Sequence, residues 1–317
     1  MELRSVIQGD GVVTNLEFHS GGQYLVMTTN ESAIQLIDCF SGTEKKKVYA
    51  KNSGVSRIQF THHESCVLIG ADARGSFEVK YLCLYDNRYL RHFHSHTSDI
   101  TSLSMSPISD NFISASKDKT VCIWDMNTPA PVAKLQLPSS FDSPLCSYDN
   151  SGVVFGVLGQ DHKHSQSSLK LFDARAYGHG PFDNIFPKRE VISSALEASN
   201  PQLTPAQKSK YLQSTWTSFE FSADGGRSIL LNSNSEAIFL LDGFQSTSSP
   251  KVILGRKNES GSMISATFSA DAKYVITGND DNDLLIFDRE STELISSLQG
   301  LFLFFVALYN MTIIIYI

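Results

Sequence analysis

Residues 112–125 read FISASKDKTVCIWD, and this stretch decides the fold. Its first five residues form an apolar run with the length of a strand, and Lys117, Asp118 and Lys119 supply a tight polar turn. The next run, residues 120–125, is again strand-like and ends in Trp124-Asp125. The stretch therefore predicts two neighbouring strands of a β-hairpin.

The same pattern occurs six times along the chain. Each copy has an alternating strand ending in an aromatic residue or Met, a turn rich in Ser, Asp and Gly, a second apolar strand, a tight turn, and a third strand ending in Asp. The residues that end the first and third strands are Phe18 and Asp38, Phe60 and Asp86, Met105 and Asp125, Tyr148 and Asp173, Phe221 and Asp242, and Phe268 and Asp288.

The copies differ in length mainly at one hairpin. From the start of the second strand to the final Asp, four copies take 14 residues, whereas residues 67–86 and 154–173 take 20. The second-to-third strand turns near residues 72–79 and 160–167 are therefore expected to be extended. Insertions at such surface turns cost little free energy.

A small sheet of this kind cannot bury both faces alone, but copies stacked around an axis can. The sequence therefore predicts an all-β protein, a β-propeller with six readable blades and a seventh that is missing or replaced by an apolar tail. The expected blades cover about residues 10–50, 51–93, 94–137, 138–186, 214–250 and 260–298. An insertion is expected at about 187–215, and a separate tail at 301–317.

The third copy resembles the WD-repeat consensus, with Trp124-Asp125 as the naming dipeptide and Ser95 in place of the usual glycine before His96. In that family the matching side chains form a hydrogen-bonded tetrad inside the blade, which implies the same structural role for His96, Ser114, Asp118 and Trp124. The alternative is a hydrolase that uses Ser114 and His96. The structural role is favoured, because Ser114 lies inside a strand without a Gly-x-Ser-x-Gly elbow.

Longer stretches, residues 85–93 (YDNRYLRHF), 103–116, 144–155, 169–182 and 216–242, resemble the WD repeat-containing protein 82 family. The resemblance implies a non-catalytic scaffold in a nuclear COMPASS-type complex that methylates lysine in a histone tail, and also in a transcription-termination phosphatase complex. It implies protein partners, above all a SET-domain methyltransferase, with the chain as a monomer within the hetero-complex. No cofactor, direct nucleic-acid partner or membrane partner is expected.

Composition agrees with these expectations. The net charge of −7 and a pI near 5.7 disfavour general binding to phosphate backbones. Five cysteines without CxxC spacing indicate free thiols in a reducing compartment. The first ten residues lack the apolar run of a secretory signal, so a nuclear or cytosolic chain is expected.

No metal site is predicted. His162, His164 and His179 are interpreted as parts of solvated loops, because no cysteine or paired carboxylate accompanies them. Asp280 and its acidic neighbours lack the glycine and distal glutamate of a calcium loop and are assigned to a tight turn.

Partners are expected on the face that carries the second-to-third strand turns, together with the extended hairpins and the insertion. The candidate contact residues are Asn30, Lys117, Asn234 and Asp280 in turns, and Asp99 and Asp142 at the entry to inner strands. The alternative is that each residue only forms its turn.

The insertion contains one helix signal. Thr204 is a suitable N-cap, Pro205 suits the first helical position, and residues 206–212 can complete two turns. The insertion is either a docking element or a tolerated surface loop, and the loop is favoured.

The tail, residues 301–317 (LFLFFVALYNMTIIIYI), is almost wholly apolar and begins abruptly after Gly300. Our interpretation is a translated intron, because a glycine codon can contain a splice-donor GT; the alternative is a tail anchor of a membrane-associated adaptor. Without a seventh blade, residues 3–7 would lack the partner that the family gives to this outer strand. The alternative to a bare gap is that the tail fills part of it as one or two strands, but 17 residues cannot replace the three inner strands of a blade, so exposed edges are still expected to favour aggregation.

Overall fold

The computed structural model describes residues 2–7, 13–50, 54–71, 77–161, 166–186, 188–245, 249–261, 264–281, 283–299, 305–309 and 312–316. The chain divides into two compact units, Met1–Tyr148 with Thr312–Ile317, and Asp149–Met311. Six four-stranded sheets are each built from four consecutive strands. These sheets confirm the all-β, WD-repeat β-propeller class.

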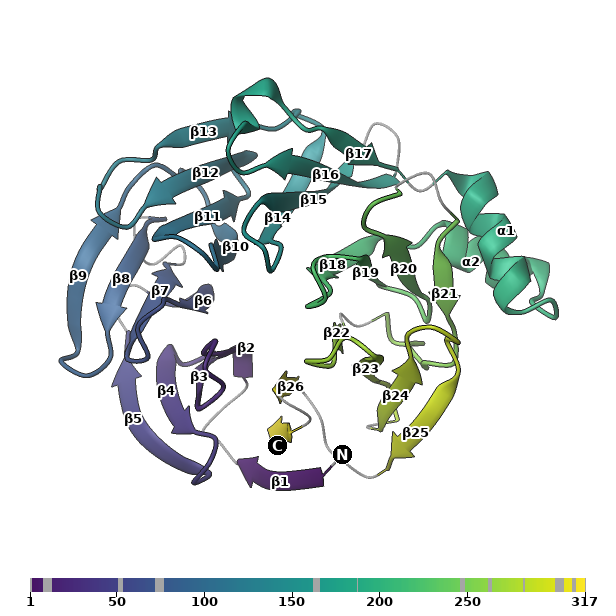
Figure 1. Cartoon of the computed structure of the whole chain (residues 1–317), viewed down its shortest axis with the longest axis horizontal. Helices are drawn as coiled ribbons and strands as arrows, with labels where there is room; N and C mark the ends of the chain where they lie inside the picture. Colours follow the sequence, from purple (N-terminus) through teal and green to yellow (C-terminus); the bar gives the residue numbers. More distant parts are fainter. Residues whose placement is uncertain are drawn as a thin grey trace. The chain divides into compact units, whose positions relative to one another are not determined.

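The first unit contains three complete antiparallel sheets, which follow one another along the chain in Figure 1. Their strands are β2 (Val13–Phe18), β3 (Tyr24–Thr29), β4 (Ala33–Asp38) and β5 (Thr43–Tyr49), then β6 (Arg57–Phe60), β7 (Cys66–Gly70), β8 (Val79–Cys83) and β9 (Arg88–Phe93), then β10 (Ile100–Met105), β11 (Asn111–Ser116), β12 (Thr120–Asp125) and β13 (Ala133–Gln136), followed by β14 (Phe141–Tyr148). Each first strand ends at the aromatic residue or Met that the repeat predicted.

The second unit continues the same strand pattern. Its elements are β15 (Val154–Asp161), β16 (Gln166–Asp173), η1 (Tyr177–His179) and β17 (Asp183–Ile185), the helices α1 (Arg189–Ser199) and α2 (Pro205–Leu212), then β18 (Trp216–Phe221), β19 (Ser228–Ser233), β20 (Ile238–Asp242) and β21 (Lys251–Ile253), β22 (Ala266–Phe268), β23 (Tyr274–Gly278), β24 (Leu284–Asp288) and β25 (Leu294–Leu298), and β26 (Phe305–Tyr309).

In five sheets, the Asp that ends the third strand forms the turn that follows it. In each, the carboxylate accepts a backbone N–H two residues further on, as in an Asx turn that leads into the fourth strand. The five are Asp38, Asp125, Asp173, Asp242 and Asp288.

The second copy departs from this pattern, and the assignment of Asp86 to the end of its third strand is wrong. Cys83 ends β8 and pairs with Cys66 at the start of β7, in the register where other copies have Asp. The hairpin between these strands is therefore three residues longer than the 14-residue copies, not six. In contrast, Asp173 ends β16 as the sequence predicted, but it pairs with Val154, which makes this hairpin five residues longer than the 14-residue copies instead of six.

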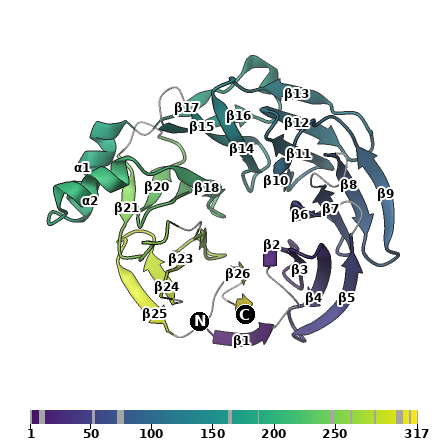
Figure 2. The same cartoon turned by 180° about the vertical axis from the view of Figure 1, so that it is seen from behind.

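The insertion forms two helices. Thr204 is the N-cap of α2: its hydroxyl accepts from the Gln207 backbone N–H at 3.3 Å, and the Gln207 side chain accepts from the Thr204 N–H at 3.0 Å. This capping box confirms the predicted helix start. The longer helix α1 was not predicted, and it lies against β21, as both Figure 1 and Figure 2 show.

The tail contributes strands. Besides β26, it contains β27 (Thr312–Tyr316), which pairs in parallel with β1 (Glu2–Ile7). The tail therefore supplies two strands, within the one or two expected to fill part of the gap, and β27 pairs with the N-terminal strand in place of a seventh-blade partner. No helix in the described part of the chain is both long and apolar enough to cross a membrane.

Candidate functional site

The third blade brings its four predicted tetrad side chains into one hydrogen-bonded chain. The indole Nε1–H of Trp124 donates to Ser114 Oγ at 2.8 Å, and His96 Nε2 lies 2.7 Å from the same oxygen. The other ring nitrogen of His96, Nδ1, lies 3.1 Å from Asp118 Oδ2. The β11–β12 hairpin supplies three of the residues, and the segment before β10 supplies His96.

Electrostatics favour an ionised pair at one end of this chain. Burial alone would lower the pKa of His96, but the hydrogen bond to Asp118, the interactions with Cys122 and the charge of Asp118 together outweigh burial and raise that pKa to about 9. Burial opposes ionisation of Asp118, yet hydrogen bonds from His96, Thr120 and the Thr97 backbone hold its pKa well below the usual range. The Asp118 carboxylate in the β11–β12 turn is therefore charged and held by several hydrogen bonds.

Packing encloses the rest of the chain in the blade interior. Trp124 stacks on Phe112 with ring centroids 5.8 Å apart and lies edge-on to Phe93 at 5.5 Å. Both Ser114 and Trp124 are 0% exposed. A substrate cannot reach a hydroxyl in this position, so the hydrolase hypothesis is wrong for Ser114.

Two of the six candidate partner-binding residues, Lys117 and Asp99, form an ion pair. Lys117 Nζ lies 3.0 Å from Asp99 Oδ2, and the Lys117 backbone N–H donates to the Asp99 carbonyl oxygen at 3.0 Å. The Lys117 side chain is half exposed and that of Asp99 one-third exposed. The pair forms a charged patch at the second-to-third strand turn of the third blade.

The other four candidates are exposed: Asn30, Asn234 and Asp280 lie in turns or bends, and Asp142 is the second residue of β14. Asp142 accepts the backbone N–H of Ser143, and Asn234 accepts that of Thr215. Asp280 accepts from both the backbone N–H and the hydroxyl of Ser260. These bonds agree with a turn-forming role, and Asn30 is also exposed in its turn.

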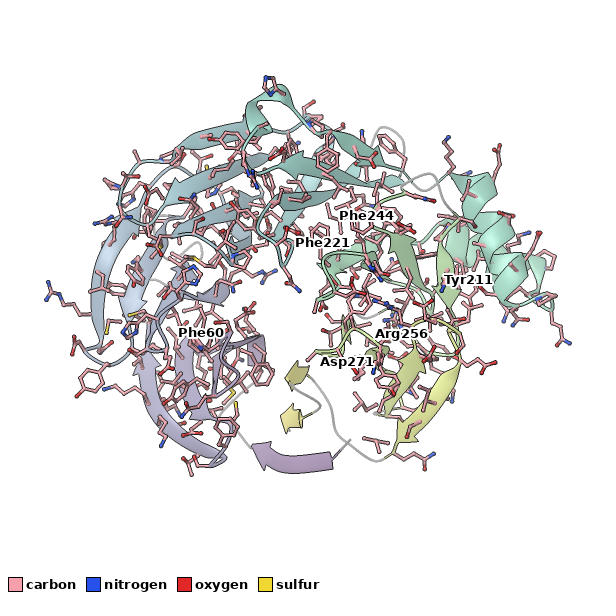
Figure 3. All side chains as sticks on the ribbon, in the orientation of Figure 1. Phe60, Tyr211, Phe221, Phe244, Arg256 and Asp271 are labelled. Carbon is pink, nitrogen blue, oxygen red and sulfur yellow. The ribbon has the colours of Figure 1, made fainter. Side chains whose placement is uncertain are left out.

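Sequence reasoning missed Arg256, which is 2% exposed (Figure 3). Its guanidinium donates to the carbonyl oxygens of Ser233, Ser235 and Ile264, and so joins the β18–β21 and β22–β25 sheets. Burial lowers its pKa to about 10. The signal was present: Arg256 follows the end of β21 by three residues, just as His96 follows β9.

A second set of residues missed in the sequence lies at the edge of the second blade. Glu78 Oε2 is 3.0 Å from His92 Nδ1 and 3.3 Å from His94 Nε2. The histidines predicted to lie in solvated loops were different ones. His179 is exposed in η1, whereas His162 and His164 lie outside the described residues.

Comparison with known proteins decides the family. Residues 87–125, which include the third-blade hairpin, match the family of the WD domain, G-beta repeat. Over 290 residues, the chain is 30% identical to WD repeat-containing protein 82 of Drosophila melanogaster, and the match covers 91% of this chain and 81% of the fly protein. The chain belongs to the WD repeat-containing protein 82 family.

Two fungal proteins that are named as components of complexes are also similar to this chain. The Set1 complex component swd2 of Schizosaccharomyces pombe is 27% identical over 87% of this chain and 71% of its own length. The COMPASS component SWD2 of Saccharomyces cerevisiae is 26% identical over 89% of this chain and 78% of its own length. These similarities span nearly the whole set of blades.

Proposed function

We propose that this chain is a non-catalytic scaffold subunit of a Set1-type (COMPASS) complex that methylates lysine in a histone tail in the nucleus. Its direct partner is a SET-domain methyltransferase subunit. The observation that carries the proposal is similarity to the Set1 and COMPASS components over 87% and 89% of the chain. Burial of the third-blade serine supports a structural role for the chemistry-bearing residues found there.

We place one part of the docking surface at Lys117 and Asp99. This pair is charged, accessible and held by a backbone hydrogen bond, so a partner meets it in a fixed orientation. Charges at the edge of an interface govern partner choice and association rate. Asn30 and Asp142 are further candidate contact residues in the first unit, and Asn234 and Asp280 are candidates in the second unit.

The test is affinity purification of the full chain from nuclei, with the methyltransferase subunit quantified by mass spectrometry. Lys117→Asp and Asp99→Lys each break the ion pair, whereas the double variant restores the pair with reversed polarity. If the charges contact the partner, the double variant recovers fewer methyltransferase subunits, by roughly tenfold. If the pair only stabilises the turn, the double variant recovers normal binding, and this surface is wrong.

A matched control reverses an exposed ion pair elsewhere. Lys251 and Glu290 lie 2.7 Å apart with well-exposed side chains, so Lys251→Glu with Glu290→Lys keeps the same net charge and an internal pair. This control is expected to bind normally. Failure of the unmodified chain to recover any methyltransferase subunit contradicts the proposed function itself.

A further inference from the structure

One face of the β8–β9 pair carries an unusual set of side chains. Lys80 in β8 pairs with His92 in β9, so the next positions on the same face, two residues away, are Glu78 and His94. Alternation along the two strands thus places one carboxylate, one ammonium group and two imidazoles together.

The spacing of the ligand atoms is that of a metal site. The Oε2 atom of Glu78 lies 3.0 Å from His92 Nδ1 and 3.3 Å from His94 Nε2, and one ligand atom from each residue lies within 4.8 Å of the others. The two imidazoles are nearly parallel, with an interplanar angle of 10°. Tetrahedral zinc with bonds of about 2.0–2.1 Å separates its ligand atoms by roughly 3.4 Å.

We propose that Glu78, His92 and His94 bind a divalent transition-metal ion, Zn²⁺, with water in the fourth position. Two imidazoles and one carboxylate are an established zinc ligand set, whereas Mg²⁺ and Ca²⁺ favour oxygen ligands. The ion joins the start of β8 to the end of β9 at the outer edge of the second blade. It neutralises a carboxylate that is otherwise shared with Lys80.

The surroundings of Glu78 fit this role. The residue is 6% exposed, and Lys80 Nζ lies 3.1 Å from its Oε1 atom, which fixes the carboxylate while Oε2 faces the imidazoles. The side chains of His92 and His94 are 44% and 65% exposed, so an ion from solvent reaches them. The competing explanation is a plain ion pair between Glu78 and protonated imidazole, which does not require a metal.

Calorimetric titration of the full chain with ZnCl₂ at pH 7.5 distinguishes a metal site from a plain ion pair. At this pH unperturbed imidazole is neutral and able to bind metal. The unmodified chain is expected to bind one equivalent that His92→Ala with His94→Ala loses or binds at least roughly tenfold more weakly. Equal binding by that variant, or no binding by the unmodified chain, overturns the proposal.

A neighbouring exposed pair gives the matched control. His62 and His63 are adjacent, exposed and followed by exposed Glu64, so His62→Ala with His63→Ala removes two accessible imidazoles beside a carboxylate. This control is expected to keep the full equivalent; if it loses the same equivalent instead, the assigned site is wrong. A melting temperature raised by Zn²⁺ in the unmodified chain and the control, but not in the His92/His94 variant, provides a second readout.

Discussion

At the scale of single residues, the third blade shows why a buried polar group needs a complete set of partners. Ser114 accepts from Trp124 and lies within hydrogen-bond distance of His96, so none of the three can be removed without leaving polar atoms unsatisfied in an apolar interior. Arg256 meets this requirement at its two terminal nitrogens, which donate to three carbonyl oxygens. Both groups join segments that the strands alone do not connect.

Truncation of Trp124 tests this account. Trp124→Ala is expected to lower the free energy of unfolding by about 3–5 kcal/mol, because it removes a buried aromatic ring and strands Ser114. Urea unfolding followed by circular dichroism measures the change. Trp124→Phe keeps an aromatic ring but not the N–H, so its free energy of unfolding should lie between those of the unmodified chain and Trp124→Ala. An unchanged unfolding curve for Trp124→Ala contradicts the structural role.

A second residue makes stability depend on pH. Burial raises the pKa of Glu220 in β18 to about 7, although hydrogen bonds from Thr267 and the Phe268 backbone act in the other direction. With a reference pKa of 4.5 when unfolded, its stabilising contribution is complete below that pH and is lost as pH rises through 7. Glu220→Gln removes this dependence.

The measurement is urea unfolding of both proteins at pH 5 and pH 8.5. Relative to Glu220→Gln, the unmodified chain is expected to lose about 2–3 kcal/mol between these pH values. The exposed Glu64→Gln serves as the control and should follow the unmodified chain. Identical pH dependence in Glu220→Gln and the unmodified chain would show that Glu220 does not titrate in this range.

At the scale of elements, the insertion is a docked pair of helices instead of a loop. Tyr211 of α2 (Figure 3) is buried and donates to Glu236 Oε2 at 2.7 Å. Lys210 forms an ion pair with the same carboxylate at 2.8 Å. Three residues of α1, Ile192, Ala195 and Leu196, are also buried. The insertion therefore has a fixed position on the β18–β21 sheet.

The cap of α2 is the element-scale prediction. Thr204→Ala removes the hydroxyl that accepts from Gln207 and should cost about 1 kcal/mol of local stability, which makes amide exchange in α2 roughly fivefold faster. Hydrogen exchange with mass spectrometry measures the rate. Thr204→Ser keeps a hydroxyl and should exchange as the unmodified helix does, whereas equal protection in Thr204→Ala would show that packing alone holds α2.

The elements differ in how well the sequence predicted them. Strand ends were predictable because a repeated Asp forms the turn after the third strand, and α2 was predictable because its cap is local. In contrast, α1 has no side-chain cap, and it is held by the packing of its buried face against β21, which the local sequence does not reveal. Glu78 and His94 were not recognised as neighbours, because only the β8–β9 register brings them together.

At the scale of the whole molecule, the apolar tail is part of a sheet. The parallel pairing of β27 with β1 begins with Glu2 opposite Thr312 and ends with Ile7 opposite Tyr316. A chain that stops before Thr312 should leave the amides of β1 nearly unprotected, because an unpaired edge strand frays. Hydrogen exchange should detect the loss in β1 and no change in β12. Unchanged protection of β1 contradicts the pairing.

The pairing of β1 with β27 also determines when β1 can pair during translation. Each blade consists of consecutive strands, so at about 5–20 residues per second a ribosome delivers a blade of roughly 40 residues within about 2–8 s. The first strand instead waits for the last one, which emerges about 15–60 s later at the same rate. Until β27 emerges, the nascent chain therefore carries an unpaired N-terminal strand, a natural substrate for chaperones that hold extended segments.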